Sequence, residues 1–267
     1  MDRSILFFDV DGTIVSEDNN RIIPESTKAA IRKANENGHI TMVNTGRTML
    51  IIEDNVKELG FSGYICGCGT NIIVNGEEIL RHKNSKELCV KVMELLERLN
   101  IQAIFESAEM MSYNGKLEIN NELMNMLDYF KKMDFNVVES HNKDFYFDKF
   151  FCWAYDDDSF LEFEDTLCKD FGIIRRGDSA GIRRCEVVPS GYSKATGMQF
   201  CLEKLGIDHK NSYAFGDSTN DLPMLEFAAH SAAMGGCPDV LKNKVDIVTD
   251  RFYDDGLAKA MERFGLI

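Results

Sequence analysis

The chain has 267 residues, 44% of them hydrophobic and 28% charged, and a formal net charge of −14. This length can bury a large core in one or two domains, and the composition is that of a soluble globular protein. The acidic balance argues against non-specific nucleic-acid binding, which needs a basic face. No run approaches ~18 consecutive apolar residues, and no basic flank precedes a long apolar region at the N-terminus, so we expect neither a membrane span nor a signal peptide.

Strand and helix signals alternate over the first third of the chain, which predicts a parallel sheet with crossover helices. The predicted strands are Ser4–Phe8, His39–Asn44 and Tyr64–Cys66, and the predicted helices are Pro24–Asn37 and Met49–Leu59. Asn75-Gly76, between the predicted strands Asn71–Val74 and Glu77–Leu80, is the strongest short hairpin signal.

The middle third predicts an α+β unit of roughly one hundred residues, a normal size for a separate domain. Its predicted helices are Ser85–Leu99, Glu122–Lys132 and Phe160–Phe171, and its predicted strands are Ile101–Phe105, Met110–Asn114, Lys149–Tyr155, Ile173–Arg176 and Arg184–Val188. This unit interrupts the alternating pattern at about residues 82–187.

From Ser193 the alternation resumes. The predicted helices are Lys194–Leu205, Leu222–Ala228, Pro238–Lys242 and Asp255–Phe264, and the predicted strands are Ser212–Phe215, Ser231–Met234 and Asp246–Val248. We therefore expect an α/β fold whose core is made of residues 1–81 and 188–267, with an α+β domain of residues 82–187 inserted into it.

Eight cysteines are scattered along the chain without a Cys-x-x-Cys pair. We therefore expect no structural zinc site. Several of these cysteines lie in apolar stretches, as buried free thiols do, and this usage favours a reducing cytoplasmic location.

Two carboxylates follow the first predicted strand, in Asp9-Val10-Asp11-Gly12-Thr13. In an extended segment residues i and i+2 project to the same side, and Gly12 allows a sharp bend directly afterwards. Both carboxylates are then presented at the carboxyl end of a parallel strand, where open α/β sheets bind ligands. Anionic groups held this close need a cation or a shared proton, and Mg²⁺ is the natural partner, although calcium loops and ordinary acidic turns carry the same pattern.

Polar residues follow the second predicted strand and open the first helix after the insertion. In Asn44-Thr45-Gly46-Arg47, a hydroxyl and backbone N–H groups after a glycine turn make a phosphate cradle, and the alternative is a helix cap by Thr45. Lys194 stands at a helix N-terminus, where the helix dipole disfavours a cation. A fixed ammonium that neutralises a carboxylate and a phosphate explains this position, and the alternative is a plain surface lysine.

The segment Gly216-Asp217-Ser218-Thr219-Asn220-Asp221 follows the predicted strand Ser212–Phe215. Asp217 is placed at the strand end, where it could meet Asp9 and Asp11. The alternative is an acidic segment that caps the next helix, since Asp and Asn are preferred there. Between an apolar strand and an apolar helix, the two carboxylates favour a cation site.

The order of these four motifs resembles the haloacid dehalogenase superfamily, most of whose members are phosphatases, over the whole α/β part. The insertion between the second and third motifs is similar to the α/β cap of the Cof-like branch, as are Val74-Asn75-Gly76 and Gly191-Tyr192-Ser193-Lys194. The resemblance implies a Rossmann-like core with an inserted cap. It also implies a phosphatase that depends on Mg²⁺ and acts on small phosphorylated metabolites, such as sugar phosphates.

The resemblance implies a role for each motif residue. Asp9 is the nucleophile that forms an aspartyl-phosphate, and Asp11 is the general acid and then the base. The residues implied to hold the substrate phosphate are Thr45, Gly46, Lys194 and Asn220. The residues implied to bind Mg²⁺ are Asp9 and Asp217 through their side chains, Asp11 through its backbone, and Asp221 close behind.

Several alternatives stay open. Ser218 stands where many relatives carry Asn, and Asn44 stands where a small apolar residue is usual, but neither change removes a primary catalytic group. A phosphosugar mutase or another phosphotransferase of the same superfamily is one rival, and a non-enzymatic phosphate-responsive module is another. Arg183 and Arg184 are candidates for gripping a second anionic group, or solvated surface residues. The sequence names neither the substrate nor the oligomeric state.

Overall fold

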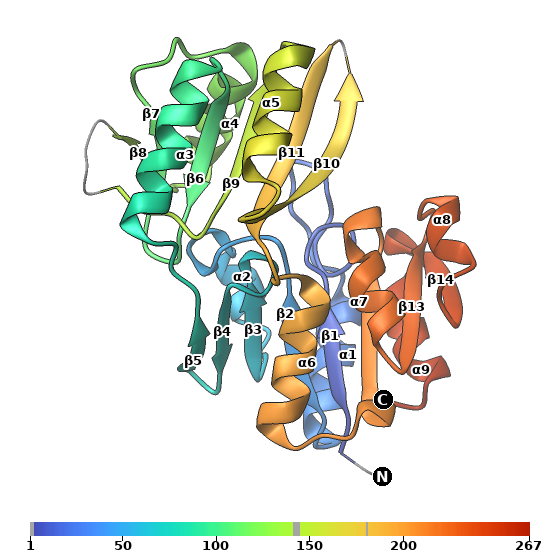
Figure 1. Ribbon diagram of the computed structural model, residues 1–267. Coiled ribbons are helices and arrows are strands. Elements are labelled where there is room, and N and C mark those ends of the chain that lie inside the picture. Colours follow the sequence, from blue (N-terminus) through green and yellow to red (C-terminus); the bar gives the residue numbers. More distant parts are fainter. Residues whose placement is uncertain (1–2, 141–144, 180) are drawn as a thin grey trace. The chain divides into compact units, whose positions relative to one another are not determined.

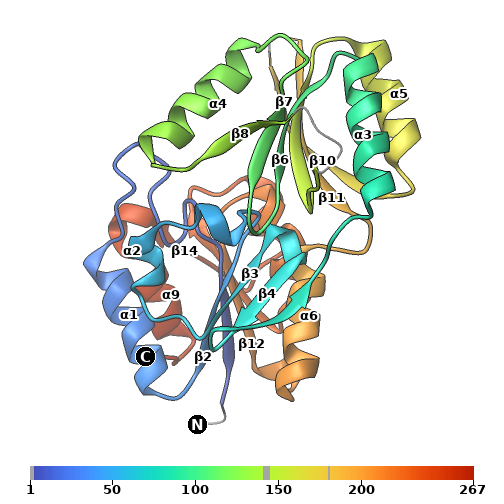
Figure 2. The ribbon, with the colours of Figure 1, turned by 90° about the vertical axis from the view of Figure 1, so that its left-hand side faces the viewer.

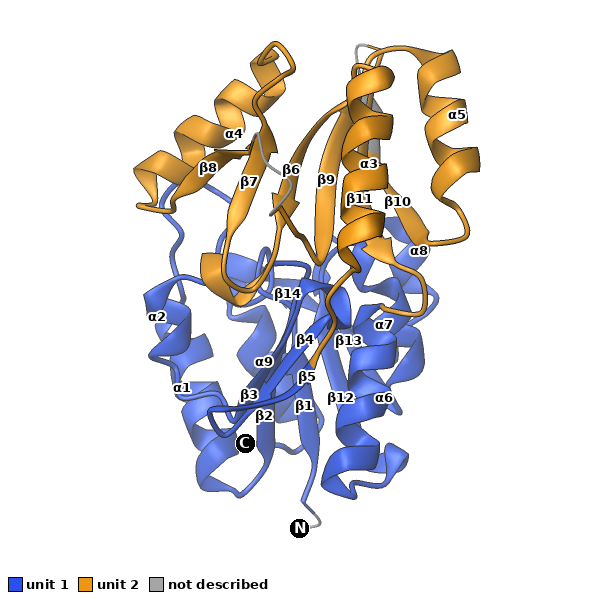
Figure 3. Cartoon of the chain, turned by 60° about the vertical axis from the view of Figure 1, so that its left-hand side comes forward, with its two compact units in different colours: residues 1–47, 52–80, 193–267 blue, residues 48–51, 81–192 orange. Residues whose placement is uncertain are grey.

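The structure is a computed structural model that describes residues 3–140, 145–179 and 181–267. The chain divides into two compact units (Figure 3). Unit 1 comprises residues 1–47, 52–80 and 193–267, and unit 2 comprises residues 48–51 and 81–192. The predicted insertion of residues 82–187 falls within unit 2, and its limits as an independently folding domain stay a prediction.

Unit 1 is built on one sheet, which in the described part of the chain has eight strands in the spatial order β14-β13-β12-β1-β2-β3-β4-β5 (Figure 1). Their bounds are β1 (Ile5–Phe8), β2 (Ile40–Asn44), β3 (Gly63–Cys66), β4 (Asn71–Val74), β5 (Glu77–Arg81), β12 (Ser212–Gly216), β13 (His230–Gly235) and β14 (Ile247–Arg251). The central strand β1 pairs in parallel with β2 and with β12. The expected α/β class is confirmed.

Helices cover both faces of this sheet. Their bounds are α1 (Glu25–Glu36), α2 (Asp54–Lys57), α6 (Lys194–Leu205), α7 (Leu222–Phe227), α8 (Asp239–Lys242) and α9 (Gly256–Arg263). In Figure 2, α1 and α9 lie on one side of the sheet and α6 on the other. Ile5 and Phe7 pack into the core cluster shared with α6 and α7. Leu6 and Phe8 are also fully buried from solvent. Burial on both faces explains why β1 is a continuous apolar run.

The connection between β2 and β3 differs from the prediction. A single helix over Met49–Leu59 is wrong, because the chain forms a short 3₁₀ helix at Met49–Ile51 and then α2 at Asp54–Lys57. Glu53 separates them with an extended backbone, at a ψ of 148°. The predicted hairpin is confirmed: Asn75 and Gly76 have φ values of 50° and 80°, as a tight two-residue turn between β4 and β5 requires.

Unit 2 is built on a second sheet, with six strands among the described residues in the order β10-β11-β9-β6-β7-β8. Its elements are α3 (Lys86–Arg98), β6 (Gln102–Glu106), β7 (Met111–Asn114), α4 (Asn121–Lys132), β8 (Val137–Ser140), β9 (Lys149–Ala154), α5 (Asp157–Leu167), β10 (Phe171–Ser179) and β11 (Ile182–Pro189). Neighbouring strands are antiparallel except β7 and β8. Figure 2 shows α3 and α5 on one face and α4 on the other.

Two details of unit 2 differ from the sequence-based prediction. The edge strand β8 was not predicted, because its sequence Val-Val-Glu-Ser is short and only half apolar. The helix expected at Phe160–Phe171 instead begins at Asp157, after the N-cap Asp156, and ends at Leu167. Phe171 opens β10 instead and pairs with Pro189 of β11.

The eight cysteines all fall within the described residues and are free thiols, and only Cys168 is exposed. Over the described ranges, no helix has the length and the apolar character needed to cross a membrane.

Candidate active site

Three neighbouring parallel strands of unit 1 deliver the predicted motifs to one edge of the sheet. Asp9 follows β1, Thr45 follows β2, and Asp217 follows β12. The backbone N–H of Asp9 donates to the carbonyl of Phe215 at 2.9 Å, which ties the first motif to the fourth. Because the carboxyl ends of parallel strands lie at the same edge, motifs separated by about two hundred residues become neighbours.

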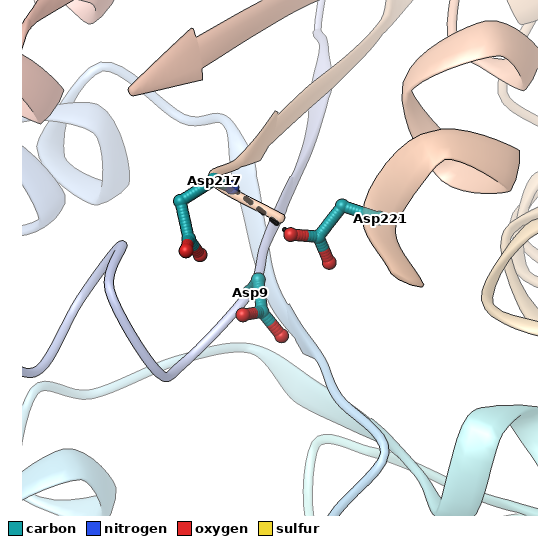
Figure 4. Close-up of side chains that lie close together, drawn as sticks. All are labelled: Asp9, Asp217 and Asp221. Carbon is teal, nitrogen blue, oxygen red and sulfur yellow. Dashed lines mark hydrogen bonds between the residues drawn. The ribbon is translucent and has the colours of Figure 1, made fainter. Parts of the chain in front are cut away.

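The carboxylates of Asp9, Asp217 and Asp221 converge (Figure 4). One oxygen from each lies within 4.8 Å of the other two. Asp9 and Asp221 are buried, and Asp217 is partly exposed. We refer to these three residues as the carboxylate cluster.

Two glycines allow the cluster to be this tight. A Cβ on Gly12, whose φ is +75°, would stand 2.5 Å from an oxygen of Asp217. A Cβ on Gly216 would stand 2.6 Å from the Cβ of Asp221. Any side chain at either position would push the fourth-motif carboxylates away, since real Cβ contacts do not come this close. Both glycines therefore act through the space they leave.

Asp221 organises the loop on which it stands. Its Oδ2 accepts hydrogen bonds from the backbone N–H groups of Asp217, at 2.9 Å, and Ser218, at 3.0 Å. The first of these is the dashed line in Figure 4. Its Oδ1 faces Lys194. The alternative interpretation, an acidic segment that caps the next helix, therefore also describes this loop. The carboxylate of Asp221 both accepts the loop N–H groups and contacts Lys194.

Lys194 is buried and stands between two members of the cluster. Its Nζ lies 2.5 Å from Oδ1 of Asp9 and 2.5 Å from Oδ1 of Asp221. The lysine opens α6 immediately after the N-cap Ser193, whose side chain accepts from the N–H of Thr196. The surface-lysine alternative is wrong, because only 3% of Lys194 is exposed.

The charges of the cluster are not balanced by Lys194 alone. Burial, helped by the charge of Asp221, raises the pKa of Asp9 to about 7. Burial, helped by the charges of Asp9 and Asp221, raises the pKa of Asp217 to about 8. Burial alone would lower the pKa of Lys194, but the charges of Asp221 and Asp9 outweigh it and hold that pKa above its ordinary value. If all three carboxylates were ionised, they and the one ammonium would carry two net negative charges, which one divalent cation would balance.

Asp11 does not join the cluster through its side chain. Its carboxylate instead accepts hydrogen bonds from Arg47, at 2.8 Å to each oxygen, and from Arg21, at 2.6 Å. Burial would raise the pKa of Asp11, but the two guanidinium groups, Arg47 foremost, lower it. The expectation that Asp9 and Asp11 share a cation through adjacent carboxylates therefore fails for the side chains, because the two arginines compensate Asp11.

The predicted phosphate-binding residues occupy the same edge of unit 1. Thr45 is buried, and its hydroxyl oxygen accepts from the N–H of Arg47 at 3.1 Å. Gly46 lies in the turn between these two residues. Asn220 accepts through its side-chain oxygen from the hydroxyl of Ser218. Ser218 thus supports the fourth-motif loop, and its hydroxyl is directed at Asn220 and Asp221.

The sequence did not identify three residues that shape the site. Arg21 is buried with a positive φ of 50°, and Glu53 is buried beside Arg21 and Arg47. Asn44, noted only as a departure, donates from Nδ2 to the carbonyl of Lys194 at 3.1 Å and so joins the second motif to the third. The Arg47 of the second motif was the only signal that an arginine was needed here.

The two candidate arginines of unit 2 are engaged by carboxylates. Arg183 pairs with Asp157 at 2.5 Å, and Arg184 pairs with Glu122 at 2.9 Å. Neither contact tests a role in substrate binding. The aromatic strand β9 contributes mainly to the core, since Phe150 and Trp153 are buried.

An α/β sheet whose central parallel strands present clustered carboxylates at their carboxyl ends, beside a buried lysine, is typical of phosphoryl-transfer hydrolases. The chain belongs to the haloacid dehalogenase-like hydrolase family, whose profile matches residues 6–261. This confirms the expected resemblance.

Curated relatives align over the whole chain. The 5-amino-6-(5-phospho-D-ribitylamino)uracil phosphatase YcsE of Bacillus subtilis is 27% identical over 100% of this chain and 97% of its own. The phosphoglycolate phosphatase of Methanobrevibacter smithii is 27% identical over 100% of both chains. The solved structure of a HAD subclass IIB sugar phosphatase matches with a TM-score of 0.82 at 26% identity, covering 99% of this chain and 100% of its own. Together they confirm the expected phosphatase enzyme and its α/β core with a cap.

Proposed function

We propose that this protein is a Mg²⁺-dependent phosphatase that hydrolyses small phosphorylated metabolites, such as sugar phosphates, through an aspartyl-phosphate. The carboxylate cluster with Lys194 carries this proposal, since its oxygens lie within 4.8 Å of one another and its charge is unbalanced. The family and the phosphatases similar to it favour hydrolysis over a non-enzymatic role. The names of the relatives, which include a sugar phosphatase, support a small phosphorylated substrate.

The donor set fits Mg²⁺. All three converging ligand atoms are carboxylate oxygens, which hard divalent cations prefer, and neither sulfur nor imidazole is among them. In this proposal Asp9 and Asp217 would hold the ion with their side chains, Asp11 with its backbone carbonyl, and Asp221 from behind. A bound Mg²⁺ would supply positive charge where the anionic nucleophile and the phosphoryl group meet.

The residues of the chain then divide the chemistry. Asp9 attacks phosphorus and forms the aspartyl-phosphate, while the bond from phosphorus to the leaving oxygen breaks. That oxygen keeps the electron pair and takes a proton from Asp11, which must carry a proton before this step, so the alcohol leaves neutral. Water then attacks the phosphorus, gives its proton to Asp11, and releases Asp9 and inorganic phosphate.

Phosphate-binding groups surround this centre. Lys194, Thr45, Gly46 and Asn220 would hold the phosphoryl oxygens that do not react, because phosphoryl transfer depends on positioning and charge neutralisation. Lys194 reaches Asp9 in the structure, so the same ammonium can meet the nucleophile and the phosphate it attacks. Unit 2 would set which leaving groups are accepted. We also propose a cytoplasmic location, which the free cysteines support.

The test is turnover of a panel of phosphorylated metabolites by the purified chain with Mg²⁺, with Asp9→Asn as the inactive comparison. Inorganic phosphate and any phosphorylated isomer are measured in the same reactions. We expect phosphate release from several sugar phosphates. A phosphorylated isomer without free phosphate would indicate a mutase, and turnover that survives in Asp9→Asn would refute the mechanism.

A further inference from the structure

A partly buried network of four charged side chains adjoins the carboxylate cluster in unit 1, and only Arg21 and Glu53 in it are buried. It consists of Asp11, Arg21, Arg47 and Glu53, and we call it the network. Arg47 binds Asp11 with two nitrogens, Nε to Oδ2 and Nη2 to Oδ1, each at 2.8 Å. Arg21 adds a third hydrogen bond to Asp11, from Nη1 to Oδ1 at 2.6 Å.

Glu53 holds both arginines without touching Asp11. Its Oε1 accepts from Nε of Arg21 at 2.8 Å and from Nη1 of Arg47 at 3.2 Å. Glu53 occupies the N-cap position of α2, yet its side chain makes no capping hydrogen bond. It is turned toward the arginines instead, and only 8% of the residue is exposed.

The network restrains its side chains more tightly than a single ion pair would. A guanidinium that meets both oxygens of one carboxylate fixes the plane and the position of that carboxylate, which a lysine cannot do. Arg21 adopts a left-handed backbone with a φ of 50°, a conformation that costs free energy in a residue with a side chain. Its guanidinium also donates to the carbonyl of Ser16 at 3.0 Å, so the loop after the first motif is bound into the same network.

The geometry points to Arg47 and Glu53 as positioning residues for proton transfer by Asp11. Arg47 sets where the Asp11 carboxyl stands, and Glu53 sets where Arg47 stands. This rests on the proposed function, since it concerns the leaving group that departs when Asp9 takes the phosphoryl group. Neither Arg47 nor Glu53 is itself a group that reacts.

The rate loss caused by poor positioning of Asp11 depends on the leaving group of the substrate. When the bond between phosphorus and the leaving oxygen breaks, an alkyl alkoxide needs the proton of Asp11, whereas a nitrophenolate leaves readily without it. Loss of positioning should therefore slow alkyl phosphates far more than nitrophenyl phosphate. Loss of a phosphate-binding residue should slow both alike, because both carry the same phosphoryl group.

The experiment compares kcat/KM for p-nitrophenyl phosphate and for an alkyl phosphomonoester that the wild type hydrolyses. The variants are Arg47→Gln, Glu53→Gln and, as the reference for lost proton transfer, Asp11→Asn. Arg98→Gln is the matched control, because Arg98 forms an exposed ion pair with Glu162 in unit 2, at 2.7 Å. The melting temperature of each variant is recorded as well.

We expect Arg47→Gln to lower kcat/KM on the alkyl ester by about 10²-fold and on the nitrophenyl ester by less than about tenfold. Glu53→Gln should lower kcat/KM about tenfold on the alkyl ester and leave the nitrophenyl ester almost unchanged, and Arg98→Gln should change neither value. Equal losses on both esters would overturn the inference, even if the melting temperature also falls. If the wild type hydrolysed neither p-nitrophenyl phosphate nor any alkyl phosphomonoester screened for this comparison, the proposed function would be refuted instead.

Discussion

Each unit of this protein buries a cluster of charged side chains, and the two clusters differ in their balance. In unit 2, Lys149 pairs with Glu106 at 3.0 Å and with Glu186 at 3.1 Å, and Arg176 also pairs with Glu186. Burial would raise the pKa of Glu186, but these two cations hold it at about 2. In unit 1, a single lysine faces two of three converging carboxylates, and the pKa of Asp9 is raised to about 7.

We infer from this difference that the charge network of unit 2 supports the fold, whereas the carboxylate cluster of unit 1 serves the cation of the proposed function. A buried carboxylate whose cations are supplied by the chain stays ionised, because its partners repay the loss of water. A buried carboxylate that lacks enough positive charge is strained until a cation or a proton arrives. Unit 2 is the first case, and the carboxylate cluster of unit 1 is the second.

The largest expected effect comes from removing the nucleophile. Asp9→Asn should lower turnover by on the order of 10⁴-fold or more, because no neighbouring group can replace the attacking oxygen. It should leave the melting temperature unchanged or raised, since it also removes a strained charge. Phosphate release and acid trapping of labelled substrate check this. Asp239→Asn, on an exposed carboxylate paired with Lys242, is the matched control and should keep full activity.

Metal removal should have an effect nearly as large. Exhaustive chelation should abolish phosphate release, and added Mg²⁺ should restore it. Ca²⁺ should inhibit, because its larger and looser coordination would misplace the phosphate. Full activity in chelator would mean that the unbalanced charge in unit 1 has another explanation.

The third effect concerns the lysine that partly balances the cluster. Lys194→Ala should lower kcat/KM by on the order of 10³-fold on every substrate alike, since all substrates share the phosphoryl group. It should also cost roughly 3 kcal/mol of stability, because buried carboxylates lose their partner. A substrate panel and thermal melting measure both.

Arg183→Ala and Arg184→Ala, in unit 2, provide the contrast. They should shift preference among phosphorylated metabolites if either side chain meets the substrate, with little effect on a small aryl phosphate. This assignment, with phosphate binding in unit 1 and substrate selection in unit 2, is wrong if Arg183→Ala and Arg184→Ala lower kcat/KM equally on all substrates. It is also wrong if Lys194→Ala only reorders substrate preference.

The smallest effect is expected from the balanced network of unit 2. The pKa of Glu186 is about 2 in the folded chain and 4.5 ordinarily. Its contribution to stability is therefore complete above pH 4.5 and is lost as the pH falls toward 2, by on the order of 3 kcal/mol. Hydrogen exchange of β9 and β11 amides across this range would follow the loss. Glu186→Gln should flatten the dependence, and Glu162→Gln, on an exposed pair, should preserve it.

Much of unit 1 could be predicted from the sequence, because its strands are apolar runs that end in motif residues. The order of strands along the chain predicts that Asp9, Thr45 and Asp217 lie at one edge of the sheet, and the structure has each of them directly after its strand. The hairpin at Asn75-Gly76 followed from local turn preference alone. The edge strand β8 was missed, since a short half-polar segment gains its structure from pairing with β7.

The arrangement around Asp11 could not be predicted. Spacing indicated that Asp11 would turn to the same side as Asp9, yet its partners Arg21 and Arg47 come from later segments. Glu53 was predicted within a continuous helix, whereas in the structure it has an extended backbone and contacts two arginines. Side-chain partners far apart in sequence leave no periodic signal.

The most direct test of this comparison is Mg²⁺ binding to the intact chain, measured by titration calorimetry without substrate. We predict one Mg²⁺ per chain for the wild type and at least about 10²-fold weaker binding for Asp217→Asn, with Glu186→Gln unchanged. Binding of equal strength in Asp217→Asn, or a loss of binding in Glu186→Gln, would contradict the claim that the unbalanced cluster of unit 1 is the cation site.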